Sequence, residues 1–220
     1  FKYDPESHGD NILENISFKA KPGQIVGIVG GTGCGKSSLV NLIPRLYDAT
    51  QGEVLVDGVD VKKYDLKALR EMIGVVLQKN VLFSGTIEEN IRWGKKDATH
   101  EEIVAACKAA QADGFINEQP DGYNTYLAQG GLNLSGGQKQ RLCIARAMIK
   151  KPKILESFYS DLKDTTVFII AQRISSVKDA DEILVVDDGK IKGVGNHDEL
   201  IKTNEIYQEI YNTQQKGVLE

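Results

Sequence analysis

The hydrophobic pattern of the first fifty residues predicts a buried strand followed by a helix. Residues 24–29 form a continuous apolar run between two glycines, which is typical of a strand inside a parallel sheet. The next pattern predicts a helix from Lys36 to about Tyr47. Pro44 lies inside this helix, and we expect it to kink the helix or to end its regular hydrogen bonding.

Other strand-like runs follow this helix and return near the C-terminus. Residues 53–61 predict a hairpin, because the turn pair Asp57-Gly58 separates two short runs of β-branched and apolar residues. The remaining β-rich runs predict strands at 73–77, 166–171 and 182–186, with a closing helix at 206–214. Residues 187–190 and 195–200 predict a turn and a helix start, respectively.

The pattern between residues 84 and 151 is helical. Thr86 with Glu89 and Thr99 with Glu102 have the spacing of capping boxes, in which each hydroxyl accepts from a backbone N–H at the start of a helix. One face of the helix after Thr99 is apolar, with Ile103, Ala106, Cys107 and Ala110 at helical spacing. The sequence therefore predicts an α/β core that is interrupted by a helical insert.

Composition narrows the class of protein. The 220 residues are 41% hydrophobic and 26% charged, as in globular proteins, and no apolar stretch approaches the ~20 residues of a membrane-spanning helix. Without a signal-peptide pattern, the chain as written is expected to be soluble. A net charge of −4 argues against nucleic acid as a partner. The three cysteines lack disulfide or zinc spacing, which predicts free thiols in a reducing compartment.

A glycine-rich motif follows the first predicted strand. Residues 30–37 read Gly-Gly-Thr-Gly-Cys-Gly-Lys-Ser and match the pattern of a phosphate-binding P-loop, placed between a strand and a helix. Glycines let backbone N–H groups converge on phosphate oxygens, Lys36 reaches the β- and γ-phosphates, and Ser37 is a ligand of Mg²⁺. The alternative is a glycine turn with a solvated lysine. We interpret Cys34 as a residue that is tolerated between the glycines rather than as a nucleophile.

A second glycine motif, Leu134-Ser135-Gly136-Gly137-Gln138, precedes another helical run. Ser135 and Gln138 form a capping box, so the motif predicts a helix start that presents two bare glycine amides and a hydroxyl to an anion. Because the P-loop already serves one nucleotide, this second site can serve another only if two chains meet. The alternative is an ordinary capped helix.

These two motifs together resemble those of the nucleotide-binding domain of the ATP-binding cassette (ABC) transporters, and the resemblance extends over nearly the whole chain. It implies an α/β fold: a P-loop NTPase core with a small antiparallel β subdomain (1–83 and 152–220) and an inserted helical subdomain (84–151). It also implies that two such domains dimerise head to tail, each ATP lying between the P-loop of one and the signature motif of the other. The ATP-binding residues implied in this chain are Tyr3, Gly30, Thr32, Gly33, Cys34, Gly35, Lys36, Ser37 and Ser38, with the signature residues Leu134, Ser135, Gly136, Gly137 and Gln138 for the ATP of the partner.

The resemblance assigns roles to residues outside the two motifs. Tyr3 matches the aromatic residue that stacks on adenine, although a packed strand tyrosine is the alternative. Gln78 matches the glutamine that contacts Mg²⁺ and the attacking water, so Ser37 and Gln78 form the implied metal site; the alternative for Gln78 is a surface residue. Residues 83–91 are similar to the exporter subclass, in which this region faces the membrane domains.

The chain departs from the family pattern after Leu155. Family members continue with further apolar residues, an aspartate (Walker B) and a catalytic glutamate, whereas here Leu155 is followed by Glu156, which we do not assign as the catalytic base. Only nine residues separate Leu155 from Thr165. They would span about 13.5 Å as a helix, too short to cross back along a strand of ~20 Å. We therefore expect about 15–20 residues of the natural protein to be absent here.

The second departure is Gln172, which stands where the family usually has a switch histidine near the γ-phosphate. Glutamine forms hydrogen bonds but does not carry a proton at neutral pH. In this respect the chain resembles the degenerate ABC domain of heterodimeric exporters, that is, the one of the two domains that departs from the family pattern. The residues implied to act in catalysis are thus Gln78 and Gln172.

Taken together, the resemblance implies an ATP-hydrolysing motor domain of an exporter of the multidrug, lipid or peptide type, with ATP and Mg²⁺ as cofactors. The implied partners are a second ABC domain, with a heterodimer favoured over a homodimer, and a transmembrane domain, which would place the chain at the cytoplasmic face of the cell membrane. Two alternatives stay open. One is a homodimeric ATPase that tolerates Gln172, and the other is a soluble regulatory ATP-binding module without a transport role.

Overall fold

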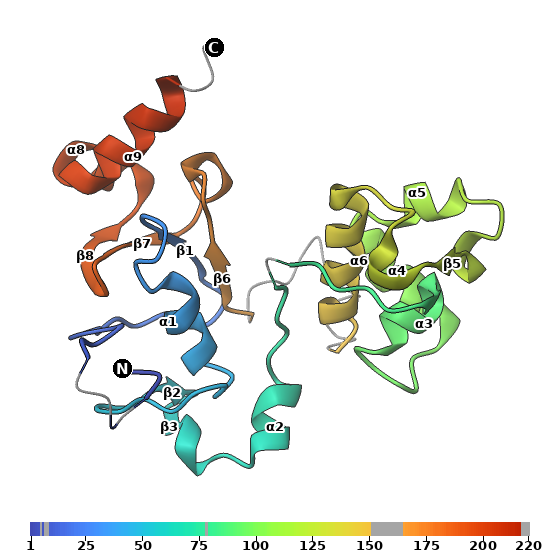
Figure 1. Cartoon of the computed structure of the whole chain (residues 1–220), viewed down its shortest axis with the longest axis horizontal. Helices are drawn as coiled ribbons and strands as arrows, with labels where there is room; N and C mark the ends of the chain where they lie inside the picture. The colour runs from blue at the N-terminus through green and yellow to red at the C-terminus, as the bar shows by residue number, and fades with distance from the viewer. Residues whose placement is uncertain (5, 7–8, 78, 151–164, 217–220) are drawn as a thin grey trace. The chain divides into compact units, whose positions relative to one another are not determined.

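The computed structural model describes residues 1–220 with the exception of 5, 7–8, 78, 151–164 and 217–220. Contacts between residues divide the chain into two compact units: residues 1–66 together with 163–220, and residues 67–162 (Figure 1). The first unit is α/β and the second is mainly helical. Residues 67–83, which the sequence analysis assigned to the α/β core, belong to the second unit by these contacts.

A four-stranded sheet in the order β6-β1-β7-β8 forms the centre of the first unit. Its strands are β1 (Ile25–Val29), β6 (Val167–Ile170), β7 (Glu182–Asp187) and β8 (Lys190–Gly195). β1 pairs in parallel with β6 and β7, whereas β7 and β8 are antiparallel. The predicted strands at 24–29, 166–171 and 182–186 are confirmed. The sequence analysis did not predict β8, because its lysines and glycines make the alternation of apolar and polar residues hard to recognise.

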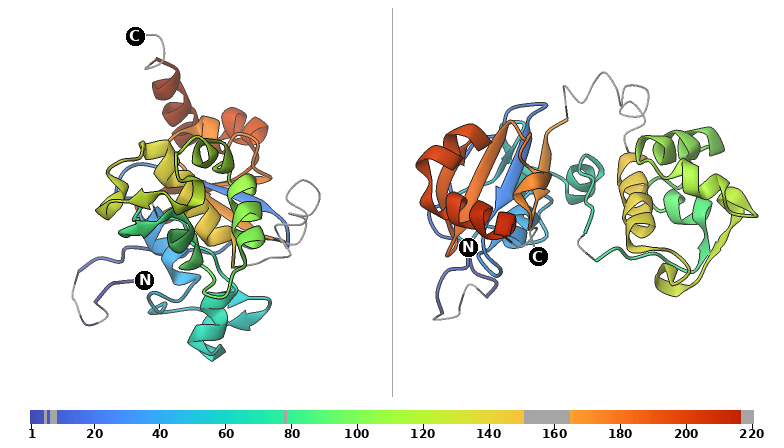
Figure 2. Two further views of the ribbon diagram at one scale, coloured as in Figure 1. Left: turned by 90° about the vertical axis from the view of Figure 1, so that its right-hand side faces the viewer. Right: turned by 90° about the horizontal axis from the view of Figure 1, so that it is seen from above.

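Helices cover both faces of this sheet (Figure 2). The covering helices are α1 (Lys36–Leu42), η5 (Ile174–Ser176), α8 (His197–Thr203) and α9 (Glu205–Lys216). Successive residues of β7 point to opposite faces: Leu184 packs with α1, and Ile183 packs with Tyr207 of α9. The α/β arrangement and the closing helix are therefore as the sequence predicts.

The predicted helix after the P-loop and the predicted hairpin are both present. α1 ends at Leu42, before Pro44, so the proline lies beyond the regular helix. The hairpin consists of β2 (Leu55–Val56) and β3 (Val59–Asp60), and it is followed by η1 (Val61–Lys63). Asp57 and Gly58 have φ angles of 49° and 78°, as a turn with two left-handed residues requires.

Most of the second unit is a group of short helices around one apolar core, which is formed by residues between Leu82 and Ile149; α2 contributes no residue to this core. Its elements are α2 (Leu66–Glu71), β4 (Gly85–Thr86), α3 (Ile87–Arg92), α4 (His100–Ala109), α5 (Asp113–Asn117), η2 (Gly122–Asn124), β5 (Tyr126–Leu127), η3 (Gln129–Gly131) and α6 (Gly136–Met148). All three predicted capping boxes are confirmed, at the starts of α3, α4 and α6. The predicted apolar face of α4 is buried, with Cys107 fully inside.

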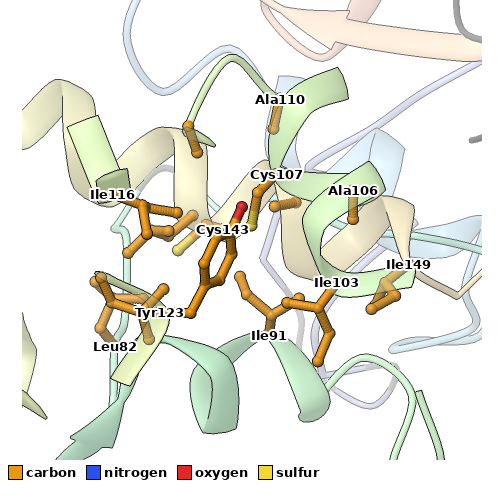
Figure 3. Close-up of a cluster of buried hydrophobic side chains, with 14 of the residues drawn as sticks. Leu82, Ile91, Ile103, Ala106, Cys107, Ala110, Ile116, Tyr123, Cys143 and Ile149 are labelled. Atoms are coloured by element: carbon orange, nitrogen blue, oxygen red, sulfur yellow. The ribbon is translucent and has the colours of Figure 1, made fainter. Parts of the chain in front are cut away.

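The centre of this core is the ring of Tyr123, which lies among Cys107, Cys143 and Ile91 (Figure 3). The Tyr123 hydroxyl donates a hydrogen bond of 2.6 Å to Asp113 Oδ1, so its polar end is satisfied. All three cysteines of the chain, Cys34 included, are free thiols, as the sequence predicts.

One predicted strand is wrong. Residues 73–77 are not in a strand, and Val75, Val76 and Leu77 are 41%, 41% and 58% exposed. Apolar alternation indicates a strand only where a neighbouring strand supplies the hydrogen-bonding ladder. Among the described residues no such neighbour pairs with this segment. The segment therefore has a strand-like sequence but lacks a described neighbouring strand to pair with.

Burial of Cys107 predicts a measurable pH dependence of stability. Burial raises the pKa of its thiol from 9.0 to about 12. Between these values the thiol ionises in the unfolded chain but stays protonated in the folded chain, so the stability that it contributes below pH 9 is lost as the pH rises towards 12. From pH 8 to pH 10, the free energy of unfolding should fall by about 1 kcal/mol more for the wild type than for Cys107→Ala. Urea unfolding measures this difference, and equal pH slopes for the two proteins would contradict it.

Candidate functional site

The P-loop is the turn between β1 and α1, and its geometry requires glycine at Gly30 and Gly35. Gly30 has a φ of 151°, and a Cβ atom there would lie 2.0 Å from the carbonyl oxygen of Val186. Gly35 has a φ of 97°, and a Cβ atom there would lie 2.7 Å from the Leu13 side chain. Only glycine fits at either position. The loop backbone therefore passes close to β7 on one side and to the N-terminal segment on the other.

The ammonium group of Lys36 lies inside the curve of this loop. Its Nζ donates to the carbonyl oxygens of Gly30 at 2.8 Å and Gly31 at 2.5 Å. The Cys34 thiol is buried beside it, with Sγ 3.5 Å from Nζ. The lysine thus brings a positive charge to the loop. Thr32 and Gly33 of the same loop are exposed.

The start of α1 favours an anion. Gly35 is the N-cap residue, no side chain caps the helix, and no acidic residue occurs in its first turn. The first backbone N–H groups of a helix carry about half a positive charge, and no carboxylate within the first turn of α1 offsets it. Ser37 is exposed and Ser38 is buried, so their hydroxyls face different surroundings.

Tyr3 is held beside α1 by its hydroxyl and by two other rings. The hydroxyls of Tyr3 and Ser38 are 2.7 Å apart. The ring of Tyr3 meets those of Phe1 and Tyr47 edge-on, with centroids 5.0 Å and 4.8 Å away. Because Tyr3 is still 51% exposed, it retains surface that can contact another ring. The structure therefore brings the predicted adenine-stacking residue to the helix that follows the P-loop.

Gln172 lies at the same edge of the sheet as the P-loop. Ile28 of β1 and Ile170 of β6 are paired in the parallel ladder, and the Ala171 N–H donates to the Ile28 carbonyl at 3.0 Å. Gly30 lies two residues after Ile28, and Gln172 lies two residues after Ile170, so both lie at the carboxyl ends of adjacent strands. In open α/β sheets this is the edge at which ligands bind.

The second glycine motif forms the start of α6 in the helical unit. Ser135 is the N-cap: its Oγ accepts from Gln138 N–H at 3.3 Å, and the Gln138 side chain accepts from Ser135 N–H at 2.9 Å. Gly136 and Gly137 are exposed, and Cβ atoms on them would meet no atom within 4 Å. Leu134 is buried and anchors the motif in the core. The result is an open helix start with bare amides and a serine hydroxyl.

The predicted site residues thus fall into two groups. The P-loop, Tyr3 and Gln172 lie in the α/β unit, and the signature residues lie in the helical unit. Gln78 and the departure from the family pattern between Leu155 and Glu156 lie outside the described residues. The sequence analysis did not single out Tyr47 or Gln214, which contact Tyr3 and the backbone around Gln172. Neither belongs to a local motif, so only the fold shows their proximity.

A P-loop between a strand and a helix, where that strand is parallel to both of its neighbours, is typical of P-loop nucleotide-binding proteins. The family model described as "ABC transporter" matches residues 13–156. The chain therefore belongs to the ABC transporter family.

Similar proteins are bacterial and eukaryotic. YgaD of Bacillus subtilis, named a multidrug export ATP-binding/permease protein, is 43% identical over 97% of this chain and 40% of its own length. YknU of the same organism, named an ABC transporter ATP-binding protein, is 44% identical over 94% of this chain and 39% of its own. ABC transporter B family member 2 of Dictyostelium discoideum is 42% identical over 98% of this chain and 17% of its own. The chain therefore spans at most about two fifths of these relatives.

A solved structure has the same fold. The structure of a bacterial Atm1-family ABC exporter with ATP bound is 36% identical to this chain, with a TM-score of 0.89, over 97% of this chain and 40% of that one. The predicted fold class is confirmed by this similarity. In the part of the chain that the structure describes, no helix combines the length and apolar character needed to cross a membrane.

The contact between Gly30 and Val186 predicts the effect of a small substitution. Gly30→Ala places a Cβ atom against the Val186 carbonyl oxygen in a backbone conformation that L-residues avoid. It should lower the free energy of unfolding by about 2–4 kcal/mol. Gly31→Ala is the matched control, because its Cβ meets no atom within 4 Å, and it should change stability by less than about 0.5 kcal/mol. Thermal unfolding compares the two, and equal effects would show that the close contact does not constrain the loop.

Proposed function

We propose that this chain is the ATP-binding motor domain of an ABC exporter, which drives transport through nucleotide-dependent head-to-tail dimerisation with a second ABC domain. The observation that carries the proposal is that this member of the ABC transporter family has two helix N-termini suited to binding an anion, at Gly35 and at Ser135. The names of YgaD and the Atm1-family protein, both exporters, support the exporter subclass.

The P-loop residues fit Mg-ATP by their chemistry. The uncapped start of α1 and the ammonium of Lys36 supply positive charge for the phosphates, and the exposed hydroxyl of Ser37 is an oxygen ligand of the kind that Mg²⁺ prefers. Thr32, Gly33, Cys34 and Ser38 complete the proposed ATP site. When bound, Mg²⁺ neutralises charge on the transferred phosphoryl group, with Gln78 as the second proposed ligand.

Tyr3 is proposed to stack on the adenine base. Its ring is large, partly exposed and fixed to α1 through Ser38, so its position relative to the phosphate loop is set before a nucleotide arrives. Gln172, at the neighbouring strand end, is proposed to face the γ-phosphate and the attacking water.

The signature motif is proposed to bind the ATP of the partner domain. Ser135 Oγ accepts from Gln138, which leaves its hydrogen free to donate to a phosphate oxygen, and the amides of Gly136 and Gly137 point from an open helix start. Catalysis at that shared site is electrostatic, because these donors stabilise charge on the transferred phosphoryl group while a base orients water.

A membrane domain is the second proposed partner. In the helical unit, Phe83 and Trp93 form an exposed pair, with ring centroids 5.0 Å apart and Trp93 65% exposed. Arg146, which lies over the Phe83 ring, donates to the carbonyls of Val81 and Asn90 and fixes the base of this pair. Exposed aromatic residues on a fixed backbone are typical of a docking surface. Phe83 is the first residue of the exporter-like stretch, and Trp93 follows that stretch by two residues.

We further propose that this half hydrolyses ATP poorly by itself. Glutamine at position 172 cannot act as a proton carrier. Two observations support an absent segment after Leu155. The family match ends at Glu156. The alignment with YgaD has 232 positions but covers only 97% of the 220 residues of this chain, so about 19 positions of the relative have no counterpart here. Such a segment would hold the missing Walker B aspartate and catalytic glutamate.

Removal of Lys36 tests nucleotide binding. Lys36→Ala should lower the affinity for Mg-ATP about 30-fold or more, because it removes a charge from a site built around it. Lys192→Ala, which removes an exposed lysine from β8 in the same unit, is the control and should bind normally. Titration calorimetry measures both affinities. If Lys36→Ala bound Mg-ATP as tightly as the wild type, the P-loop assignment would be incorrect.

Substitution of Ser135 tests the shared site. In a dimer with a partner that has a switch histidine and a catalytic glutamate, Ser135→Ala should lower ATP turnover about 10-fold or more while leaving this chain's own ATP affinity unchanged. Thr99→Ala is a matched control, since it removes an equivalent capping box from α4. Equal losses for both variants would point to helix destabilisation alone.

The two alternatives give different results. Substantial turnover by this chain without a partner would favour the homodimeric ATPase. A parent gene without membrane-spanning segments next to this region would favour the regulatory module over the exporter.

A further inference from the structure

The side-chain amide of Gln214, in α9, forms a bridge to the backbone on both sides of Arg173. Its Nε2 donates to the Gln172 carbonyl at 2.8 Å, and its Oε1 accepts from the Ile174 N–H at 2.8 Å. One amide therefore satisfies a backbone acceptor and a backbone donor that are two residues apart. This is the arrangement by which a neighbouring strand would hold an extended segment.

The bridged segment is the continuation of β6 beyond its ladder. The last bond from this segment to β1 is donated by the Ala171 N–H, and Arg173 is extended, with φ −113° and ψ 132°. The Gln172 side chain is exposed, so its own packing does not fix its direction. Because Gln172 stands level with the first P-loop glycine, a small rotation of this backbone moves its amide towards or away from the phosphate loop.

Packing fixes the two sides of the segment but not Gln172 itself. Ile174 and Val177 are buried against Tyr207 of α9, which anchors the chain after the bridge. Ala171 is buried on the other side. Between these anchors, the Gln214 amide is the hydrogen-bonding group that the structure shows on the Gln172 carbonyl. The orientation of Gln172 therefore depends on a residue of the C-terminal helix.

We propose that Gln214 is a positioning residue for Gln172, through which α9 sets the contact of Gln172 with the γ-phosphate. This inference rests on the proposed role of Gln172. It extends that role by assigning part of the recognition of ATP over ADP to the C-terminal helix, far from both glycine motifs in the sequence.

The chemistry of the bridge suggests three variants. Gln214→Leu removes both hydrogen bonds. Gln214→Glu keeps the acceptor for the Ile174 N–H, but the carboxylate cannot donate to the Gln172 carbonyl and repels it. Gln215→Leu is the matched control, because Gln215 is the adjacent, exposed glutamine of the same helix.

The experiment compares the affinities of Mg-ATP and Mg-ADP for the wild type, Gln172→Ala, Gln214→Leu, Gln214→Glu and Gln215→Leu by titration calorimetry. We expect the wild type to prefer ATP. Gln172→Ala and both Gln214 variants should lower the ratio of ATP to ADP affinity about threefold to tenfold, the effect of one hydrogen bond, with ADP affinity unchanged. Gln215→Leu should match the wild type.

Amide hydrogen exchange at Ile174 provides a second measurement that does not need nucleotide. Exchange should be faster in Gln214→Leu and close to the wild-type rate in Gln214→Glu, which retains the acceptor. Equal rates in the wild type and Gln214→Leu would show that the bridge does not hold this backbone, and would overturn the proposal.

The outcomes separate the inference from the function on which it rests. A lower ratio in Gln172→Ala with an unchanged ratio in Gln214→Leu overturns the positioning role alone. An unchanged ratio in Gln172→Ala, or a wild type without preference for ATP, overturns the γ-phosphate role of Gln172 and the inference with it. Equal losses of ATP and ADP affinity in Gln214→Leu would show a merely structural residue, which also overturns the positioning role.

Discussion

The loop that we propose binds phosphate depends on the absence of a side chain at residue 30. The loop leaves β1 so close to the end of β7 that a single methyl group would overlap the carbonyl oxygen of Val186. This closeness fixes the direction in which the backbone turns, and with it the two carbonyl oxygens that hold the Lys36 ammonium. The same turn delivers the chain to α1 in a left-handed conformation at Gly35, so that the helix starts without a side-chain cap. The position of the Lys36 charge and the path of the loop backbone therefore both depend on the close approach of Gly30 to β7.

The two helix starts achieve related chemistry by different means. α1 begins in a loop that curves around its own lysine, whereas α6 begins at a serine whose hydroxyl is already engaged with the helix backbone. The first arrangement places positive charge where the proposed phosphate site lies. The second offers amides and a hydroxyl from a surface without nearby side chains, which suits a ligand that is brought by another molecule. Each start is next to a buried leucine: Leu13 lies close to Gly35, and Leu134 precedes Ser135.

The local signals in the sequence predicted most of the fold, and the non-local ones did not. Capping boxes, the Asp57-Gly58 turn and the apolar face of α4 each depend on residues within one turn or one hairpin, and the structure has them all. The strand predicted at residues 73–77 failed because a strand needs a partner, and no periodicity reports whether the partner is present. Both motifs of the candidate site were legible for the same local reason. Tyr47 and Gln214 were not, because their contacts join segments that lie far apart in the chain.

The α/β unit is assembled from both ends of the chain, while the helical unit is one continuous stretch. β1 lies between β6 and β7, which follow it by more than a hundred residues, so the sheet cannot close until the C-terminal quarter of the chain has been synthesised. During translation, the helical unit can therefore complete its core first, while the strand that precedes the P-loop waits with its apolar edges unpaired. A nascent chain of this kind is most exposed to aggregation before its last strands emerge from the ribosome.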